Sequence, residues 1–589
     1  MLQIKLHTHW LDVDKNTTIQ WEIENPLFTQ GELLGDVSGN FSVPATPNNA
    51  TAFSYAHIIS HYTNGQPQYS GEVWVEGIRL FIVTITVESC TNTRYNLHMV
   101  SKAVTDLANK TLQDIDWQDE TAIEPPTANA DTYPTYTHCY PVVKNDKFFT
   151  YQDDPDFVAL GPTLNSNEYT GYLNLQYTDT AVSISPSAVV PMFYLYYILQ
   201  KFFEGINYTL QANWDSELLS LFIYNNYSVK EYTLVAPPGG GFNFWGLPPT
   251  INPKNHLPKE SIANILADLE AKFGIKAYIN PIAQTVTLRF AKNVVESTYY
   301  ISVDDWIVTR DYKITWEDET QVDRCYAPDE LDEFCTEPTK ITPPNVITAT
   351  VDAWQNLPAP NTVTNTAIYF VENINVYAQA KTQETPPGSG TYVKEWRILT
   401  HNDFCLEVGS NDSIESSTPM LMGYWDTPTL TADLWITPRI DQLGSERLYY
   451  DVGLLDSIDN FIHPFNFRIS FYRGLMPTKA GNQPDYALAN YTPYDAAGNN
   501  IGNYSLDYND ATYGLYEKWL KPYYQFLQNT KIVERSMRLT ITDLLNLDLS
   551  KKVAINEIDS LQLYLIKTIK IVLRHDGIQP ATVTLCKTY

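Results

Sequence analysis

Strict alternation of apolar and polar residues in two neighbouring stretches constrains the fold of this chain more than any other feature. In EVWVEGIRLFIVTITVES (Glu72–Ser89) apolar residues recur at every second position, and TRYNLHMVSK (Thr93–Lys102) continues the pattern. A period of two is typical of strands that bury one face. The phase changes near Gly77 and again between Ile82 and Val83, and we expect a β-bulge or a strand break at each change. The pattern predicts long strands of a small barrel or sandwich.

Helical periodicity occurs mainly in the middle of the chain. MFYLYYILQKFFEGINYTL (Met192–Leu210) carries one apolar helix face and stops at Gly205. HLPKESIANILADLEAKFG (His256–Gly274) places Pro258 at a helix start, and its buried stripe contains Ile262, Ile265, Leu266, Leu269 and Phe273. Two alternating stretches follow around a turn at Pro281, so the sequence predicts a helix–hairpin module of the α+β type.

The exposed face of the same helix is also predictable from this spacing. Asp268 falls between the positions of the apolar stripe, so we expect its side chain to face solvent, whereas Leu266 and Leu269 face the core.

The length of 589 residues implies several domains, because single cores stop growing near about 250–300 residues. We expect a mainly β fold with α+β inserts, in which one β module at each end of the chain flanks helix–hairpin insert domains; the family resemblance given below implies that these are two tube-like β-barrel modules. No internal repeat can be aligned within the sequence. The predicted division is 1–118 (N-terminal barrel module), 119–190 (linker and irregular aromatic-rich segment), 191–298 (α+β helix–hairpin insert), 299–460 (β-rich peripheral region) and 461–589 (C-terminal β module, completing the second barrel).

A long polar connection interrupts the first module. NPLFTQGELLGDVSGNFSVPATPNN (residues 25–49) is rich in Gly and Pro and lies between two stretches that are typical of strands. Long connections without secondary structure are uncommon in compact domains and are usually functional or disordered. We therefore predict an arm that reaches a neighbouring subunit, where its backbone hydrogen bonds would be completed.

The charge of the chain is strongly unbalanced, with 68 acidic and 39 basic residues and a formal net charge of −29. This composition argues against a protein that wraps nucleic acid, because phosphate contacts need clustered Lys and Arg. An acidic wall would instead let DNA slide past. If the chain lines a channel for DNA, we expect its channel-facing strands to carry more Asp and Glu than Lys and Arg. Acidity that serves solubility alone is the alternative.

No motif in the sequence indicates catalysis, a cofactor or a metal. G-x-S-x-G and H-E-x-x-H are absent, and PPGGGFNFWG (Pro237–Gly246) lacks the Lys-Ser/Thr of a phosphate-binding loop. His7 and His9 have no visible third ligand, and YQDDPDF (Tyr151–Phe157) lacks the Gly and the later Glu of a calcium loop. Six cysteines without a CxxC spacing predict no disulfide framework and no zinc site. We expect no catalytic, cofactor-binding or metal-binding residues, and a protein that is not an enzyme.

Membrane insertion and secretion are not expected either. The first 21 residues contain no apolar signal core. The most apolar uncharged run, TAVSISPSAVVPMFYLYYILQ (Thr180–Gln200), is long enough for a membrane span, but its Ser and Pro residues favour a buried segment.

Several sequence blocks resemble tail proteins of phages that infect Bacteroidetes. IENPLF, FSVPATPNN and YSGEVWVEGIRLFIVTITVES resemble the opening of these proteins, and LQKFFEGINYTLQANWDSELLSLFIYNNYS resembles their next block. HLPKESIANILADLEAKFGIKAYIN resembles the helix–hairpin insert of tail hub and tail-tip proteins, and FRISFYRGL with YGLYEKWLKPYYQFL resembles the start of the closing module. The order of the blocks along the chain carries the resemblance, which covers residues 345–456 poorly.

The resemblance implies a baseplate hub or tail-tip protein of the virion. Such proteins form rings, commonly trimers, in which two tube-like barrels in each of three chains match a six-fold tail tube. The implied partners are other copies of the chain, the tail tube or distal tail protein, the tape measure protein and receptor-binding or fibre proteins. DNA would pass through the lumen without specific binding, and contact with the host outer membrane surface would be indirect.

A second hypothesis comes from the 41 Tyr and 13 Trp residues. An aromatic load of this kind also suits an extracellular carbohydrate-binding or carbohydrate-degrading β protein of the adhesin type. A hub is expected to be strongly oligomeric, whereas a lectin or a hydrolase need not be.

Overall fold

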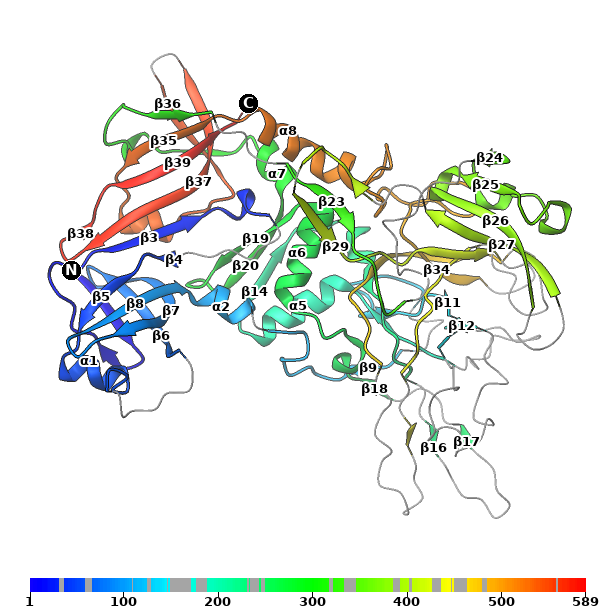
Figure 1. Cartoon of the computed structure of the whole chain (residues 1–589), viewed down its shortest axis with the longest axis horizontal. Helices are drawn as coiled ribbons and strands as arrows, with labels where there is room; N and C mark the ends of the chain where they lie inside the picture. The colour runs from blue at the N-terminus through cyan, green and yellow to red at the C-terminus, as the bar shows by residue number, and fades with distance from the viewer. Residues whose placement is uncertain are drawn as a thin grey trace.

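The computed structural model is mainly β with α+β inserts, as predicted. Figure 1 shows the N-terminal strands (blue) beside the C-terminal strands (red) at the left, helices α5 and α6 in the middle and strands β24–β27 at the far right. The structure describes residues 1–588 apart from 31–36, 59–65, 109, 124–128, 146, 149–170, 176–187, 230–231, 234–242, 245–248, 317–320, 333–345, 385–391, 402–404, 411, 426–435, 446–447, 450–462, 479–484 and 558–559.

The alternating stretches of the N-terminal module form the strands that the sequence predicts. Strands β1 (Leu2–Leu6), β6 (Gln68–Val75), β7 (Ile78–Cys90) and β8 (Arg94–Ser101) are antiparallel neighbours. The first phase change is a two-residue turn, in which Glu76 and Gly77 both have positive φ. The second is a bulge, because Trp74 pairs with Arg79 and Val73 with Phe81, which leaves Leu80 unpaired. The bulge lies two residues before the predicted position.

The C-terminal strands continue the same sheet. Strands β35 (Ile532–Met537), β36 (Lys552–Asn556), β37 (Leu561–Arg574) and β39 (Ala581–Lys587) pair with each other, and β3 (Ile19–Glu24) joins them to the N-terminal module through β37. Three further strands, β2 (His9–Trp10), β4 (Val37–Ser38) and β22 (Lys313–Thr315), complete the path of the sheet, which runs in the order β2-β1-β6-β7-β8-β4-β3-β37-β39-β35-β22. Both modules enclose one hydrophobic core, to which each contributes fully buried residues such as Ile85 and Ile569.

The two modules repeat one topology. The first has the order β5 (Phe41–Pro44), α1 (Pro47–Ala52), β6, β7, β8, and the second has β35, α9 (Ile541–Leu545), β36, β37, β39. In both, the first strand pairs with the last, the second with the third, and the third with the last, all antiparallel. Both helices start after a threonine N-cap, Thr46 or Thr540. The structure thus contains an internal repeat that the sequence does not reveal.

The described residues of the predicted arm pack within the chain, and two of its segments are strands of this sheet. Strand β4 (Val37–Ser38) pairs with β3 and β8, and β5 pairs with β8. The side-chain amide of Asn25 donates to the carbonyls of Leu549 and Ile566 at 2.9 and 2.6 Å. Because these hydrogen bonds are completed within the chain, the prediction of an arm reaching another subunit is wrong for residues 25–30 and 37–49.

The two helical units belong to one α+β insert. Helices α5 (Leu195–Gly205) and α6 (Ile262–Phe273) accompany a three-stranded sheet, in the order β14 (Thr209–Ala212), β20 (Thr285–Phe290), β19 (Ile275–Asn280). The helix–hairpin order is as predicted, and Gly274 ends α6 in the left-handed conformation. The start of α6 differs, because Ser261 rather than Pro258 caps it.

The solvent-facing position predicted for Asp268 is wrong. Its carboxylate is buried, accepts from Lys272 Nζ at 2.5 Å and accepts from the backbone N–H of Ser417. Helix α6 packs against both β19 and β29 (Ser413–Ser416), so it is covered on two sides and offers little surface for a charged face. Burial lowers the pKa of Lys272, an effect that the charge of Asp268 opposes.

The peripheral region contains a separate six-stranded sheet, in which β26 and β27 form a long hairpin. Next to it, strands β23 (Asp323–Tyr326) and β28 (Cys405–Leu406) are joined by a disulfide between Cys325 and Cys405. The prediction of a chain without disulfides is therefore wrong. The strands of the sheet are β24 (Ala349–Val351), β25 (Ile368–Val371), β26 (Val376–Glu384), β27 (Tyr392–His401), β30 (Met422–Trp425) and β31 (Thr437–Pro438).

The remaining elements join the insert to the C-terminal module. Strands β15 (Leu221–Ile223), β33 (Ile469–Met476) and β34 (Tyr486–Asn490) form a small sheet. A π-helical turn over Tyr516–Leu520 continues as α8 (Lys521–Asn529), with Pro522 in the first turn of α8. In the described part of Thr180–Gln200, most side chains from Ala188 onward are buried. Among the described residues, no helix is both long and apolar enough to cross a bilayer.

Replacement of Leu266 by alanine tests the buried stripe of α6. Leu266 is 5% exposed within the main core, so Leu266→Ala should lower the free energy of unfolding by about 2–5 kcal/mol. Asn264→Ala, at an exposed position of the same helix, should cost less than about 0.5 kcal/mol. Equal losses in chemical denaturation of the two variants would contradict this orientation of the helix.

Candidate assembly surface

The structure assembles no catalytic or metal site from the residues that the sequence singled out. His7 and His9 are exposed at the turn between β1 and β2 (His9–Trp10). Among the described residues no three His, Cys, Asp or Glu side chains come close enough to hold a metal ion. The Asp residues of YQDDPDF lie outside the described part of the chain, as does most of Pro237–Gly246.

Cross-strand pairs of opposite charge occupy the face of the sheet opposite to the core. Lys5 and Glu72 lie opposite each other on β1 and β6, and their charged atoms are 3.9 Å apart. Glu22 and Lys570 lie opposite each other on β3 and β37, with their charged atoms 2.9 Å apart. Pairs of this kind favour the strand register and neutralise the surface of the sheet.

The strands of this sheet do not share the acidic character of the chain. Over all its strands Lys and Arg outnumber Asp and Glu by two to one. The prediction of acid-rich strands is therefore wrong for the described strands. The acidic excess lies elsewhere in the chain. Residues 1–101 carry nine acidic and four basic residues, and residues 531–589 carry six acidic and nine basic residues. Nearly all of the net charge of −29 therefore comes from residues 102–530, between the two modules.

Two ends of the sheet, at β22 and at β2, carry exposed aromatic residues. At one end β22 (Lys313–Thr315) has a strand partner only on its β35 side among the described residues, and Tyr312 and Trp316 flank it. Trp316 is 78% exposed. At the other end the short strand β2 covers part of β1, and Trp10 is 44% exposed and packs edge-on against Trp74 at 5.7 Å. Exposed Trp and Tyr side chains of this kind are frequent at protein interfaces.

A buried network of charges attaches the α+β insert to the base, which is the large sheet formed by the N-terminal and C-terminal modules. Lys276 Nζ donates to Glu270 Oε1 at 3.0 Å and to the carbonyl of Thr29 at 2.5 Å. The guanidinium of Arg324 donates to the same carboxylate at 3.1 Å and to the hydroxyl of Tyr524 at 2.7 Å. The network therefore connects α6, β19, β23, α8 and the segment that follows β3.

The charges in this network change the pKa of Glu270. Burial alone would raise the pKa, but the charges of Lys276 and Arg324 and their hydrogen bonds outweigh burial and lower it to about 2. A carboxylate whose pKa is lower in the folded state than in the unfolded state stabilises the folded chain at pH values above its unfolded-state pKa. This stabilisation is lost as the pH falls towards the folded-state pKa.

Comparison with known proteins gives only remote similarities. No family model matches the chain, and no curated protein matches its sequence. Among solved structures it is similar to the 43 kDa tail protein of prophage MuSo2 from Shewanella oneidensis, with a TM-score of 0.31 and 9% identity over 99% of this chain and 97% of that chain. It is also similar to a tail protein from Neisseria meningitidis MC58, with a TM-score of 0.30 and 8% identity over 99% and 95% of the two chains. Both are described as tail proteins, but similarity at this level carries no argument about this chain.

Replacement of Glu270 by glutamine tests the buried network. Glu270→Gln leaves two buried cations without a carboxylate and should cost about 3–5 kcal/mol at neutral pH. The stability of the unmodified chain should fall as the pH drops from about 4.5 to about 2, because the unfolded carboxyl takes up its proton first, and the variant should lack this part of the fall.

Thermal unfolding followed across this pH range measures both effects. Glu204→Gln is the matched control, because Glu204 forms a surface pair with Lys201 at 3.0 Å and should cost less than about 1 kcal/mol. A pH profile of Glu270→Gln that parallels that of the unmodified chain would contradict the assignment.

Proposed function

We propose that this chain is a structural protein of a phage tail that forms the ring of the baseplate hub or tail tip. The observation that carries the proposal is the repeat of one β topology at the two ends of the chain, fused into a single sheet with a single core. Two equivalent modules side by side allow three chains to present six units to a six-fold tube. The order of the sequence blocks described above supports the same assignment.

The arrangement of the inserts suits this role. The α+β insert lies between β8 and β21 (Tyr300–Ser302) in the sequence and the peripheral sheet lies between β22 and β35, so both extend from the paired modules (Figure 1). In a ring, the modules would line the channel, and the acidic inserts would lie outside and contact the tail tube, the tape measure protein and receptor-binding proteins. Localisation at the distal end of the tail follows from this role.

The sheet face opposite to the core is the candidate channel wall. Its cross-strand ion pairs would neutralise part of this wall, in contrast to the acidic wall expected from the net charge. A cation that is paired with a carboxylate on this wall is not free to bind phosphate through counterion release, which favours passage of DNA without specific binding. On this assignment the acidity of the chain serves its outer surface.

Electron cryomicroscopy of the phage particles that contain this chain tests the proposal. Density for the chain should lie at the distal end of the tail, with six similar β modules around the channel and three copies of the peripheral sheet outside them. Mass spectrometry of purified particles provides the control for its presence. Absence of the chain from the particles, or a position in the capsid, would overturn the proposal.

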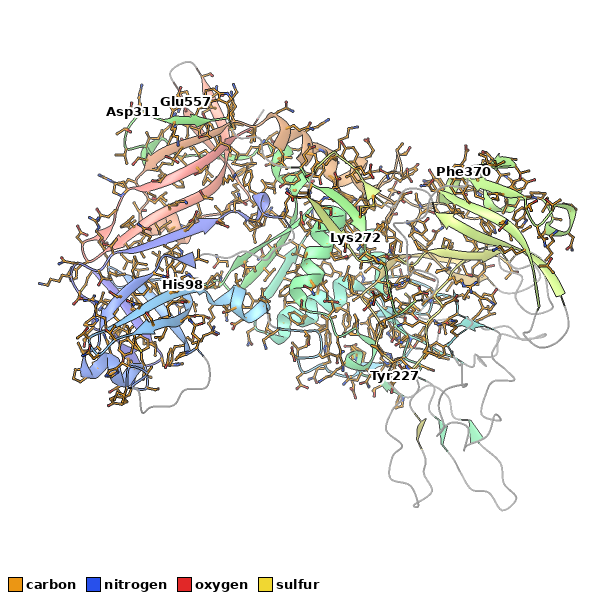
Figure 2. The ribbon with its side chains drawn as sticks, in the orientation of Figure 1. His98, Tyr227, Lys272, Asp311, Phe370 and Glu557 are labelled. Atoms are coloured by element: carbon orange, nitrogen blue, oxygen red, sulfur yellow. A yellow bond between two sulfur atoms is a disulfide. The ribbon has the colours of Figure 1, made fainter. Side chains whose placement is uncertain are left out.

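A carbohydrate-binding function remains the second candidate because of one feature of the peripheral sheet. Phe370 and Tyr377 lie opposite each other on β25 and β26, are half-buried, and have ring centroids 4.9 Å apart. Gln379 follows on the same face, and Figure 2 shows Phe370 on the peripheral sheet, far from the base. Aromatic rings beside an amide can pack on the apolar face of a sugar and hydrogen-bond its hydroxyls.

Binding of the purified chain to an array of bacterial surface glycans tests this second function. Tyr377→Ala should abolish binding, whereas Tyr300→Ala, at an exposed position on the base, should leave it unchanged. Absence of binding by the unmodified chain, or equal loss in both variants, would exclude a carbohydrate site at this pair.

A further inference from the structure

We infer that a small pocket beside helix α6 binds an alkylammonium group, carried either by a free amine or by a lysine side chain. The pocket has a volume of about 300 Å³, which is at the lower end of the range for small-molecule sites. It lies between the first half of α6, the segment that follows β23, the end of β29 and the segment that precedes β33. It belongs to the region between the two modules, so it is independent of the hub assignment, which rests on the modules themselves.

All charged residues that line the pocket are acidic, and these are Glu260, Asp268, Asp329 and Glu415. Two of them have a cationic partner, since Lys272 lies 2.5 Å from Asp268, and Arg468 lies 2.6 Å from Asp329. Arg468 is shared with a further buried carboxylate, Asp332, at 2.9 Å. Within the described part of the chain Glu260 and Glu415 form no ion pair, and neither do their neighbours Lys259 and Glu330. Five carboxylates at or behind the pocket therefore face two cations, and this imbalance is complementary to a positively charged ligand.

One carboxylate oxygen at the pocket lacks a hydrogen-bond donor. The side chain of Asp268 is buried, with only 7% of the residue exposed, and its Oδ1 accepts from Lys272 and from the backbone N–H of Ser417. Its Oδ2 is also buried but has no partner among the described residues. Buried polar atoms are normally hydrogen-bonded, and one that is not lowers the stability of the fold. A donor that enters the pocket can supply the missing hydrogen bond.

Other polar side chains of the pocket also favour a ligand that donates hydrogen bonds. The hydroxyl of Thr418 donates its only hydrogen to a backbone carbonyl of the chain, so its oxygen can only accept from a ligand. The side-chain amide of Asn264 donates to Glu260 at 2.6 Å, and that of Asn466 donates to Asp329 at 2.7 Å. The oxygens of both amides remain as acceptors. An ammonium group has three donors and no acceptor, so it matches a lining of this kind.

Two other kinds of cation match the pocket less well. The carboxylates are too far apart to share a metal ion, because no three acidic, His or Cys side chains of the described residues come close enough to hold one. A guanidinium binds a carboxylate best through both of its oxygens, but Oδ1 of Asp268 is already occupied by Lys272 and Ser417. An ammonium group is a compact charge that needs only the one free oxygen. The small volume also suits a single alkyl chain that ends in such a group.

Isothermal titration calorimetry on the full chain at low ionic strength tests this binding site. The probes are cadaverine, the blocked peptide acetyl-Gly-Lys-Gly-amide, and the same peptide with its lysine acetylated. Cadaverine and the lysine peptide should bind with a stoichiometry of one and compete with each other, whereas the acetylated peptide, which lacks the charge, should not bind. Tighter binding of cadaverine would assign the site to free amines, and tighter binding of the peptide would assign it to a lysine of a partner protein.

Variants of the lining residues place the binding in the pocket. Ala267→Leu fills the pocket without a change of charge and should abolish binding, and Glu415→Gln should weaken it about two- to fivefold, the usual effect of one exposed ion pair. Glu372→Gln is the matched control, because it removes one exposed carboxylate from the peripheral region and should leave the affinity unchanged. Unchanged melting temperatures confirm that the variants are folded.

Several results would overturn the assignment of an ammonium site. These are a dissociation constant above about 10 mM for both amines, equal binding of the acetylated peptide, equal weakening by Glu415→Gln and Glu372→Gln, or undiminished binding to Ala267→Leu. Displacement of cadaverine by Ca²⁺, but not by Na⁺ at equal ionic strength, would make the pocket a metal site instead. None of these results bears on the hub assignment, which electron cryomicroscopy tests separately.

Discussion

The pairing of β3 with β37 is the interaction on which the rest of this structure depends. It joins residues 19–24 to residues 568–573, so the two ends of the chain lie in one sheet. The indole of Trp21 on β3 stacks on Phe81 of the first module at 4.4 Å, and the amide of Asn25 ties the end of β3 to the carbonyl of Ile566. Without this strand, the sheet and core that the two modules share would separate into two halves with exposed apolar surface.

The paired modules also determine where the inserts can go. Between β8 and β35 the chain returns to the large sheet only in β21 (Tyr300–Ser302) and β22, among the described residues, and the buried carboxylate of Glu270 fixes the α+β insert by contacting Lys276 and Arg324. A buried carboxylate with two cationic partners is costly to break, because removal of one partner leaves an uncompensated charge. The insert is therefore attached by a polar network as well as by apolar packing, and this network requires a specific orientation of α6.

Local patterns in the sequence predicted local structure well. The alternation from Glu72 to Lys102 predicted the strands of this region and one bulge, and Gly274 predicted the end of α6. Features that depend on distant residues were not predictable in the same way. Asp268 was assigned to solvent because its helix position is polar, yet its buried carboxylate accepts hydrogen bonds from Lys272 and Ser417. Cys325 and Cys405 are 80 residues apart, and only the pairing of β23 with β28 brings them together.

The candidate assembly surface was hidden for a related reason. The repeated modules share strand order and threonine caps but no alignable sequence, because a β topology requires only alternation and turns at suitable positions. Net charge was misleading for a different reason, since it sums over regions with opposite roles. Strands that lie side by side favour opposite charges across each pair, which removes acidity from the sheet, whereas the inserts have no such constraint and can carry the excess.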